Sequence, residues 1–359
     1  MNDRLNDGEQ GVFNFRLNNF NLICLLAAIQ VVLWHGIEHL HVPVHHVILD
    51  FLNYLPGVPI FFVISGYLIA ASLERTSSIW LYVQNRLLRI YPALWACFAL
   101  SLAIVLFVFQ AKFTLKQLLV WGCAQLSIGQ FYNPEFLSEF GLGVLNGSLW
   151  TIPVELQFYM VLPFLYFFLK WMKWNKWSVI ALMLALAAFN QIFVYQFKGE
   201  EFVVFKLLGV SVFPYLYMFL LGVLLQKHIW FVERFLHGKA LLWLGVLTVW
   251  SVIAYFLGLP CQGNYLNPVS ALLLGLLTIS LAYSRVGTLK WLIGNYDISY
   301  GVYIYHMLII NLLLFYGGGQ PWGNLTILVV GSVVIATLSW VFIEKPALSL
   351  KKIAFRGAK

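Results

Sequence analysis

The sequence contains few charged residues. Asp, Glu, Lys and Arg make up only 10% of its 359 residues, hydrophobic residues make up 61%, and the mean hydropathy is +0.83. About 25% of the residues of a soluble domain are charged, so this composition excludes an ordinary soluble protein and favours one that spans the bilayer. We interpret the net charge of +8 as attraction to anionic membrane lipids and predict no nucleic-acid partner.

Cysteine is also scarce. Cys24, Cys97, Cys123 and Cys261 show no metal or redox spacing, and most lie in or beside apolar runs. This pattern argues against a disulfide framework and gives no reason to expect a bound metal or a permanently bound cofactor.

What the sequence does contain is long, continuous apolar runs. A run of about 20 residues spans a bilayer as a helix, whereas barrel strands would alternate apolar and polar residues over about 10 positions. The sequence therefore predicts an all-α polytopic membrane bundle of about ten transmembrane helices. We place the spans at 19–39, 57–73, 87–109, 149–169, 177–196, 205–226, 240–257, 266–284, 297–316 and 324–344.

The basic residues of the loops predict the orientation. On this map 18 of the 22 Lys and Arg residues lie on one side, leaving only Lys112, Lys116, Lys198 and Lys206 on the other. Cytoplasmic loops carry the basic excess, so both termini should be cytoplasmic. We expect a cytoplasmic tail at 1–18, a ten-helix domain at 19–346 and a basic cytoplasmic tail at 347–359, with the long loop 110–148 outside, where it could line an acceptor site.

An ionisable side chain inside the hydrocarbon core is costly and marks a candidate functional site. His35 lies two-thirds of the way along the first span, and an imidazole can accept a hydroxyl proton near neutral pH. Two other interpretations remain open. His35 could simply bond to a neighbouring helix, or it could bind a metal with His39, although no third ligand is apparent.

Two further motifs allow both a structural and a functional interpretation. Ser65 and Gly66 lie inside an apolar span, where small residues let either a helix or a ligand approach closely. Arg86 and Arg89 are three residues apart and share a helical face. Their guanidinium groups suit a phosphorylated ligand, but they could equally contact lipid headgroups.

The remaining candidates are also polar residues in spans. Glu155 lies one and a half turns into the fourth span with Tyr159 one turn further on; it could orient His35 or bond structurally to another helix. Tyr300 and His306 belong to an aromatic-rich span with a histidine at depth. At the end of the last span, we expect Glu344 to cap the helix or form a salt bridge and Pro346 to end it.

These segments share the order of a known family. They are the first-span histidine, Phe-Phe-Val-Ile-Ser-Gly-Tyr at 61–67, Arg-Leu-Leu-Arg-Ile-Tyr-Pro at 86–92, Ser-Leu-Trp-Thr-Ile-Pro-Val-Glu at 148–155 and Ile-Ser-Tyr with a later Tyr-x-x-His at 298–306. Together they resemble the acyltransferase type 3 family of integral membrane acyltransferases, in its stand-alone branch without an appended esterase-like domain.

The resemblance implies a function. Such proteins move an acyl group, typically acetyl, from cytosolic acyl-coenzyme A to a hydroxyl of an extracytoplasmic carbohydrate or lipid-linked glycan, such as O-antigen, capsule or exopolysaccharide, at the bacterial inner membrane. It implies that His35 is catalytic, that Arg86 and Arg89 bind the coenzyme A phosphates and that Ser65 and Gly66 lie along the acyl path. Trp150 and Glu155 match the fourth-span signature of the family.

One position departs from the family pattern. The family usually has Arg or Lys eleven residues before the histidine, where this chain has Cys24, about 16 Å from His35 along a helix. Donor binding would then rely more on Arg86 and Arg89, or proceed differently. Two other functions remain open from sequence: a transporter or flippase of a lipid-linked sugar without covalent chemistry, and a structural membrane subunit.

Overall fold

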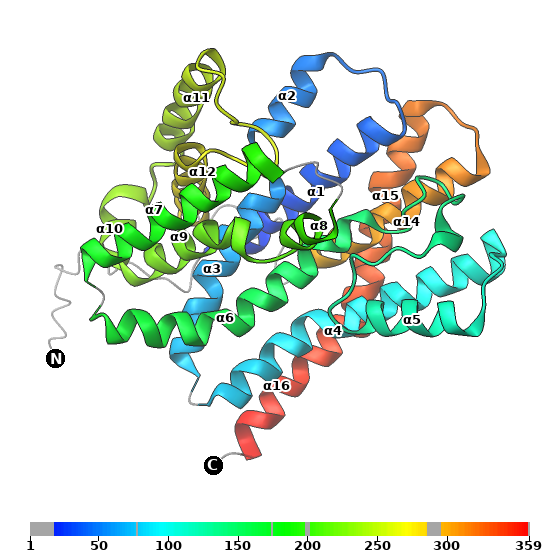
Figure 1. Ribbon diagram of the computed structural model, residues 1–359, viewed down its shortest axis with the longest axis horizontal. Helices are drawn as coiled ribbons and strands as arrows, with labels where there is room; N and C mark the ends of the chain where they lie inside the picture. Colours follow the sequence, from blue (N-terminus) through cyan, green and yellow to red (C-terminus); the bar gives the residue numbers. More distant parts are fainter. Residues whose placement is uncertain (1–17, 77, 174, 198–201, 286–295, 358–359) are drawn as a thin grey trace, which may run out of the picture.

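The chain is helical throughout the part that the structure describes. The computed structural model describes residues 18–76, 78–173, 175–197, 202–285 and 296–357 and contains no strand in these ranges (Figure 1). The α-helices are α1 (Phe20–His39), α2 (His46–Tyr54), α3 (Gly57–Arg75), α4 (Ile79–Ala103), α5 (Leu115–Leu126), α6 (Thr151–Trp171), α7 (Lys176–Ile192), α8 (Val203–Gly209), α9 (Leu216–Lys227), α10 (Ile229–Phe231), α11 (Ala240–Phe256), α12 (Pro268–Ala282), α14 (Ser299–Tyr316), α15 (Pro321–Ser339) and α16 (Lys345–Gly357).

The prediction of an all-α membrane bundle is confirmed. Within the described residues, seven helical segments are long and apolar enough to cross a membrane, and two bent pairs, α8 with α9 and α10 with α11, raise the number to nine. The shorter α12 is also apolar. Apolar helices thus lie at all ten predicted places, while the count of ten spans and the orientation stay predictions.

Two helices lie in segments that we had expected to be loops. The amphipathic α2 precedes α3, and its N-terminus is capped because the His45 side chain accepts a hydrogen bond from Val47 N (3.4 Å). In the long 110–148 loop, α5 begins with a capping box in which Thr114 and Gln117 bond reciprocally. Both helices are too short to appear as spans in a hydropathy pattern.

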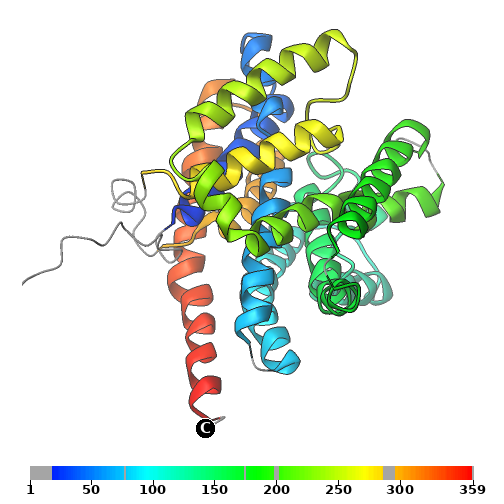
Figure 2. The same cartoon turned by 90° about the vertical axis from the view of Figure 1, so that its left-hand side faces the viewer.

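The expectation that Pro346 ends the last helix is wrong. Pro346 does not end a helix, because a π-helical turn at Trp340–Glu344 joins α15 to α16 and places the proline in the first turn of α16. The helix is continuous through this point, since Lys345 N bonds to Trp340 O across the wider π-helical turn that directly precedes the proline. The predicted tail is therefore helical through Gly357 and packs beside α4 (Figures 1 and 2). Of the predicted N-terminal tail, only Asn18 lies within the described residues.

Helices α3 and α9 pack closely through glycines. A Cβ on Gly66 would lie 2.0 Å from Phe219 O, and one on Gly222 would lie 2.1 Å from Val63 O. Such approaches are possible only where a side chain is missing. Gly66 is therefore buried against the backbone of a neighbouring helix.

We expect Gly66→Ala to destabilise the protein. The added methyl has no room unless the two helices separate, and overpacking typically costs about 1–3 kcal/mol. Thermal unfolding of the detergent-solubilised protein should show a lower midpoint. Gly245→Ala is the matched control, because a Cβ at this α11 glycine meets nothing within 4 Å; equal midpoints for the two variants would contradict the expectation.

Candidate active site

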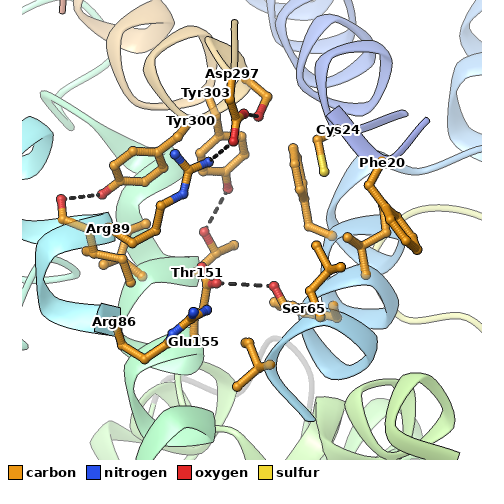
Figure 3. Close-up of a pocket in the computed structure, with 18 of the residues that line it drawn as sticks. Phe20, Cys24, Ser65, Arg86, Arg89, Thr151, Glu155, Asp297, Tyr300 and Tyr303 are labelled. Atoms are coloured by element: carbon orange, nitrogen blue, oxygen red, sulfur yellow. Dashed lines mark hydrogen bonds and ion pairs between the residues drawn. The ribbon is translucent and has the colours of Figure 1, made fainter. Parts of the chain in front are cut away.

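A cavity of about 180 Å³ lies among α1, α3, α4, α6 and the start of α14. Most of the residues singled out from the sequence line it together (Figure 3). They are Ser65, Arg86, Arg89, Glu155, Tyr159 and Tyr300. We call this space the arginine cavity. Gly66, by contrast, is not among its lining residues, so its role here is helix packing.

Glu155 joins two helices at the wall of the arginine cavity. Its carboxylate accepts hydrogen bonds from Ser65 Oγ (3.1 Å) and from the Tyr159 hydroxyl. Figure 3 shows Ser65 and Glu155 facing each other across the space between α3 and α6. From the sequence we had considered that Glu155 could orient His35. In the structure its carboxylate bonds to these two hydroxyls instead.

The two arginines have different surroundings. Arg86 donates one bond, from Nη2 to Ser72 Oγ (3.1 Å), while its Nε is buried and has no hydrogen-bond partner among the described residues. Arg89 forms ion pairs with Asp297 (2.6 Å) and with Glu344 (3.8 Å). Arg86 therefore lines the cavity without a carboxylate partner among the described residues and packs over the Tyr159 ring, 5.8 Å from its centroid, whereas Arg89 is held by two carboxylates.

Asp297 was not identified from the sequence. The available signal was its position directly before an apolar helix, two residues from Ser299, whose hydroxyl bonds to Asp297 Oδ1 (2.9 Å). Glu344 was expected to cap or to form a salt bridge. It is 2% exposed, accepts a bond from Ser339 Oγ (3.2 Å) and lies near Arg89, so the salt bridge is confirmed.

His35 pairs with the second histidine. His35 Nδ1 lies 2.8 Å from His306 Nε2, and His306 Nδ1 lies 2.6 Å from the Tyr303 carbonyl oxygen. A carbonyl oxygen only accepts, so His306 Nδ1 carries the proton, and the other nitrogen of a neutral imidazole must be an acceptor. His35 Nδ1 therefore donates, which leaves His35 Nε2 unprotonated and able to act as a base.

Tyr303 connects this histidine pair to the arginine cavity. Its side chain lines the cavity, and its hydroxyl donates to Ser148 O (2.9 Å) and accepts from Thr151 Oγ1 (3.0 Å). Its carbonyl holds the buried His306. The pair thus lies one helical turn beyond the cavity wall, while His35 itself is not a lining residue.

Comparison of the sequence with known proteins identifies a family. A family model described as an acyltransferase domain matches residues 17–344. The chain belongs to the acyltransferase type 3 family. Because seven helices in its described part are apolar and long enough to span a membrane, it is an integral membrane acyltransferase.

Three relatives of this acyltransferase were found. Nodulation protein 10 of Rhizobium leguminosarum bv. viciae is 33% identical over 354 residues, covering 93% of this chain and 94% of that protein. The O-acetyl transferase of Shigella phage Sf6 is 32% identical over 29% of the chain and 32% of its own length. Peptidoglycan O-acetyltransferase OatA of Listeria monocytogenes is 34% identical over 32% of the chain and 20% of its own length. No solved structure matches.

Other candidate residues of the acyltransferase lie around these features. Trp150 packs against Tyr215, with ring centroids 5.4 Å apart, and borders a second cavity. Cys24 lines the arginine cavity, so the position at which the resemblance led us to expect a basic residue faces the same space as Arg86. No group of three potential metal ligands occurs among the described residues, and His39 only stacks on His35 with centroids 5.6 Å apart.

Proposed function

We propose that this acyltransferase transfers an acetyl group from cytosolic acetyl-coenzyme A to a hydroxyl of an extracytoplasmic surface carbohydrate, at the bacterial inner membrane. The observation that carries the proposal is that the Arg86 guanidinium lines the same cavity as Tyr303, whose carbonyl holds the His306 that orients His35. Two of the relatives are named as O-acetyltransferases, one of them acting on peptidoglycan, which supports a hydroxyl of a glycan as acceptor.

The donor end of the reaction lies at the arginine cavity. On the orientation predicted from the loop charges, this end of α4 faces the cytoplasm, where acyl-coenzyme A is made. The Arg86 guanidinium, which lines the cavity, binds a phosphate oxygen of acyl-coenzyme A through a charge-assisted hydrogen bond. Arg89, already neutralised by Asp297 and Glu344, adds little free positive charge and mainly holds α4 against α14 and the end of α15.

The acceptor end lies at His35. His35 Nε2 removes the proton of the attacking hydroxyl as the hydroxyl oxygen bonds to the thioester carbonyl carbon. The carbon–sulfur bond then breaks, the coenzyme A sulfur leaves with its electron pair, and the imidazolium returns the proton to it. A transient acyl group on His35 is the other route by which the same groups could act; both routes need an unprotonated Nε2.

Mass spectrometry of surface glycans tests this function. We expect a strain lacking the gene to lose acetyl-sized mass differences from one glycan, and the wild-type gene to restore them, while the gene with His35→Ala should not. A succinyl-sized difference would change the donor assignment. A flippase without covalent chemistry predicts an unchanged acetylation pattern and altered glycan export, which would contradict the proposal.

A further inference from the structure

A second cavity, of about 200 Å³, lies beside the segment that follows α5. One buried water needs only about 10–15 Å³ of such space, so a ring-sized molecule is a reasonable occupant. The wall contains four amide side chains, and we call this space the amide cavity. The amides are Gln125, Gln130, Asn133 and Asn146.

Hydrogen bonds to the backbone fix the orientation of two of these amides. Gln125 Nε2 donates to the carbonyls of Gln130 (3.3 Å) and Tyr132 (3.2 Å), and Gln130 Nε2 donates to those of Gln125 (3.1 Å) and Ser127 (2.7 Å). Both NH₂ groups are therefore fully used. What remains of each amide is its Oε1, which can only accept a hydrogen bond.

The Gln130 oxygen has no donor. Gln130 is 3% exposed, and its Oε1 is buried and has no hydrogen-bond partner in the described part of the chain. A buried acceptor without a partner is unfavourable and uncommon in folded proteins. Because Gln130 lines the amide cavity, an O–H or N–H group brought by a ligand, with a small side-chain adjustment, would satisfy this acceptor.

The rest of the wall restricts the class of ligand. None of the side chains that line the amide cavity is charged, and four are aromatic, namely Trp121, Phe131, Tyr132 and Trp150. Apolar aromatic faces together with a few oriented polar groups are typical of small-molecule sites. This combination suits an uncharged, hydroxyl-rich ring, whose C–H face packs on an aromatic side chain while its hydroxyls bond to amide oxygens.

The amide cavity is connected to the candidate active site through α14. Asn146 Nδ2, from the cavity wall, donates to Ile304 O (2.7 Å), and Asn311 Nδ2 donates to Leu145 O (3.0 Å). Ser148 follows in the same segment and accepts the Tyr303 hydroxyl. The wall is thus bonded along the helix that carries His306.

We propose that the amide cavity binds an uncharged sugar ring of the acceptor glycan, next to the sugar whose hydroxyl is acylated. This inference rests on the proposed function, because it assigns part of the acceptor to a named site. Binding of a second sugar ring in the amide cavity would make the enzyme prefer oligosaccharide acceptors. A monosaccharide cannot occupy the active site and the amide cavity at once.

Filling the amide cavity tests this. Val144 is 40% exposed and lines the amide cavity, so Val144→Trp places a large side chain there without removing a side-chain hydrogen bond. The matched control is Leu142→Trp. Leu142 is 37% exposed and belongs to the same loop, but it does not line the cavity. The probes are mono- to tetrasaccharide fragments of the unacetylated surface glycan from the deletion strain. In Val144→Trp we expect the KM for tetrasaccharide to rise at least about tenfold, while the KM for monosaccharide and the acceptor-free hydrolysis of acetyl-coenzyme A stay unchanged.

Other outcomes overturn the proposal. An unchanged tetrasaccharide KM in a Val144→Trp protein with wild-type size-exclusion and thermal profiles would overturn it, as would an equal rise in Leu142→Trp. If Val144→Trp does not fold, Phe131→Ala, which removes a 43% exposed aromatic from the wall, must raise the same KM. Failure of the wild-type enzyme to acetylate any fragment would instead contradict the proposed function and is distinguishable from these results.

Discussion

His35→Ala is expected to lower kcat for acetyl transfer by about 10²–10⁴-fold, the usual contribution of a general base. The structure gives the reason, because the bond from His35 Nδ1 to His306 leaves Nε2 as the unprotonated nitrogen of the pair. Initial rates with labelled acetyl-coenzyme A and acceptor, measured in lipid nanodiscs, test this. His39→Ala is the control, since His39 lies one turn away and stacks on His35 without a hydrogen bond to either histidine of the pair. Wild-type rates in His35→Ala would contradict the assignment.

His306 is expected to act as a positioning residue for His35. His306→Leu removes the acceptor that fixes the His35 tautomer, so kcat should fall while the KM values for donor and acceptor stay close to wild type. His306→Gln should recover part of the rate, because its oxygen can accept from His35 Nδ1 while its NH₂ donates to Tyr303 O. A purely structural role predicts equal damage from both substitutions, with loss of thermal stability.

The helices could be predicted from the sequence, because apolar runs of about 20 residues report the lipid environment directly. The bends between α8 and α9 and between α10 and α11 could not be predicted, because a hydropathy pattern gives the length of an apolar helix but not the angle to the next one. The helix α2 was missed for a related reason: it is too short to be recognised as a span.

Six of the residues that line the arginine cavity were singled out from the sequence, but Asp297 and most of the hydrogen-bond partners were not. Motif resemblance singled out Arg89, Glu155 and His35. Which residue each one faces depends on the rotation and packing of helices far apart in sequence. Glu155 faces α3 and bonds to Ser65, not to His35. In the same way, Gly66 is adjacent to Ser65 in sequence but packs on α9, because neighbouring residues on a helix point about 100° apart.

Arg86→Ala is expected to raise the KM for acetyl-coenzyme A by about 10–100-fold. Hydrogen bonds to charged groups contribute about 1.5–3 kcal/mol, and about 1.4 kcal/mol corresponds to a factor of ten. The effect should vanish with S-acetylpantetheine, an acetyl thioester without phosphates, because the Arg86 guanidinium, which lines the cavity, would then have no anion to bind. Equal changes in the KM for both donors would show that Arg86 does not bind phosphate.

Arg89 should behave differently from Arg86, although the two share a motif. Arg89→Ala leaves Asp297 and the buried Glu344 without their cation, so we expect loss of folded protein more than a selective loss of donor binding. Neutralising the partners in Arg89→Ala/Asp297→Asn/Glu344→Gln should restore thermal stability, whereas the same two partner changes should not rescue Arg86→Ala. Cys24 is consistent with these different roles. Where the resemblance led us to expect a basic residue, this chain has a thiol that lines the arginine cavity. Arg86 is therefore the cavity arginine whose positive charge is not taken up by an ion pair among the described residues.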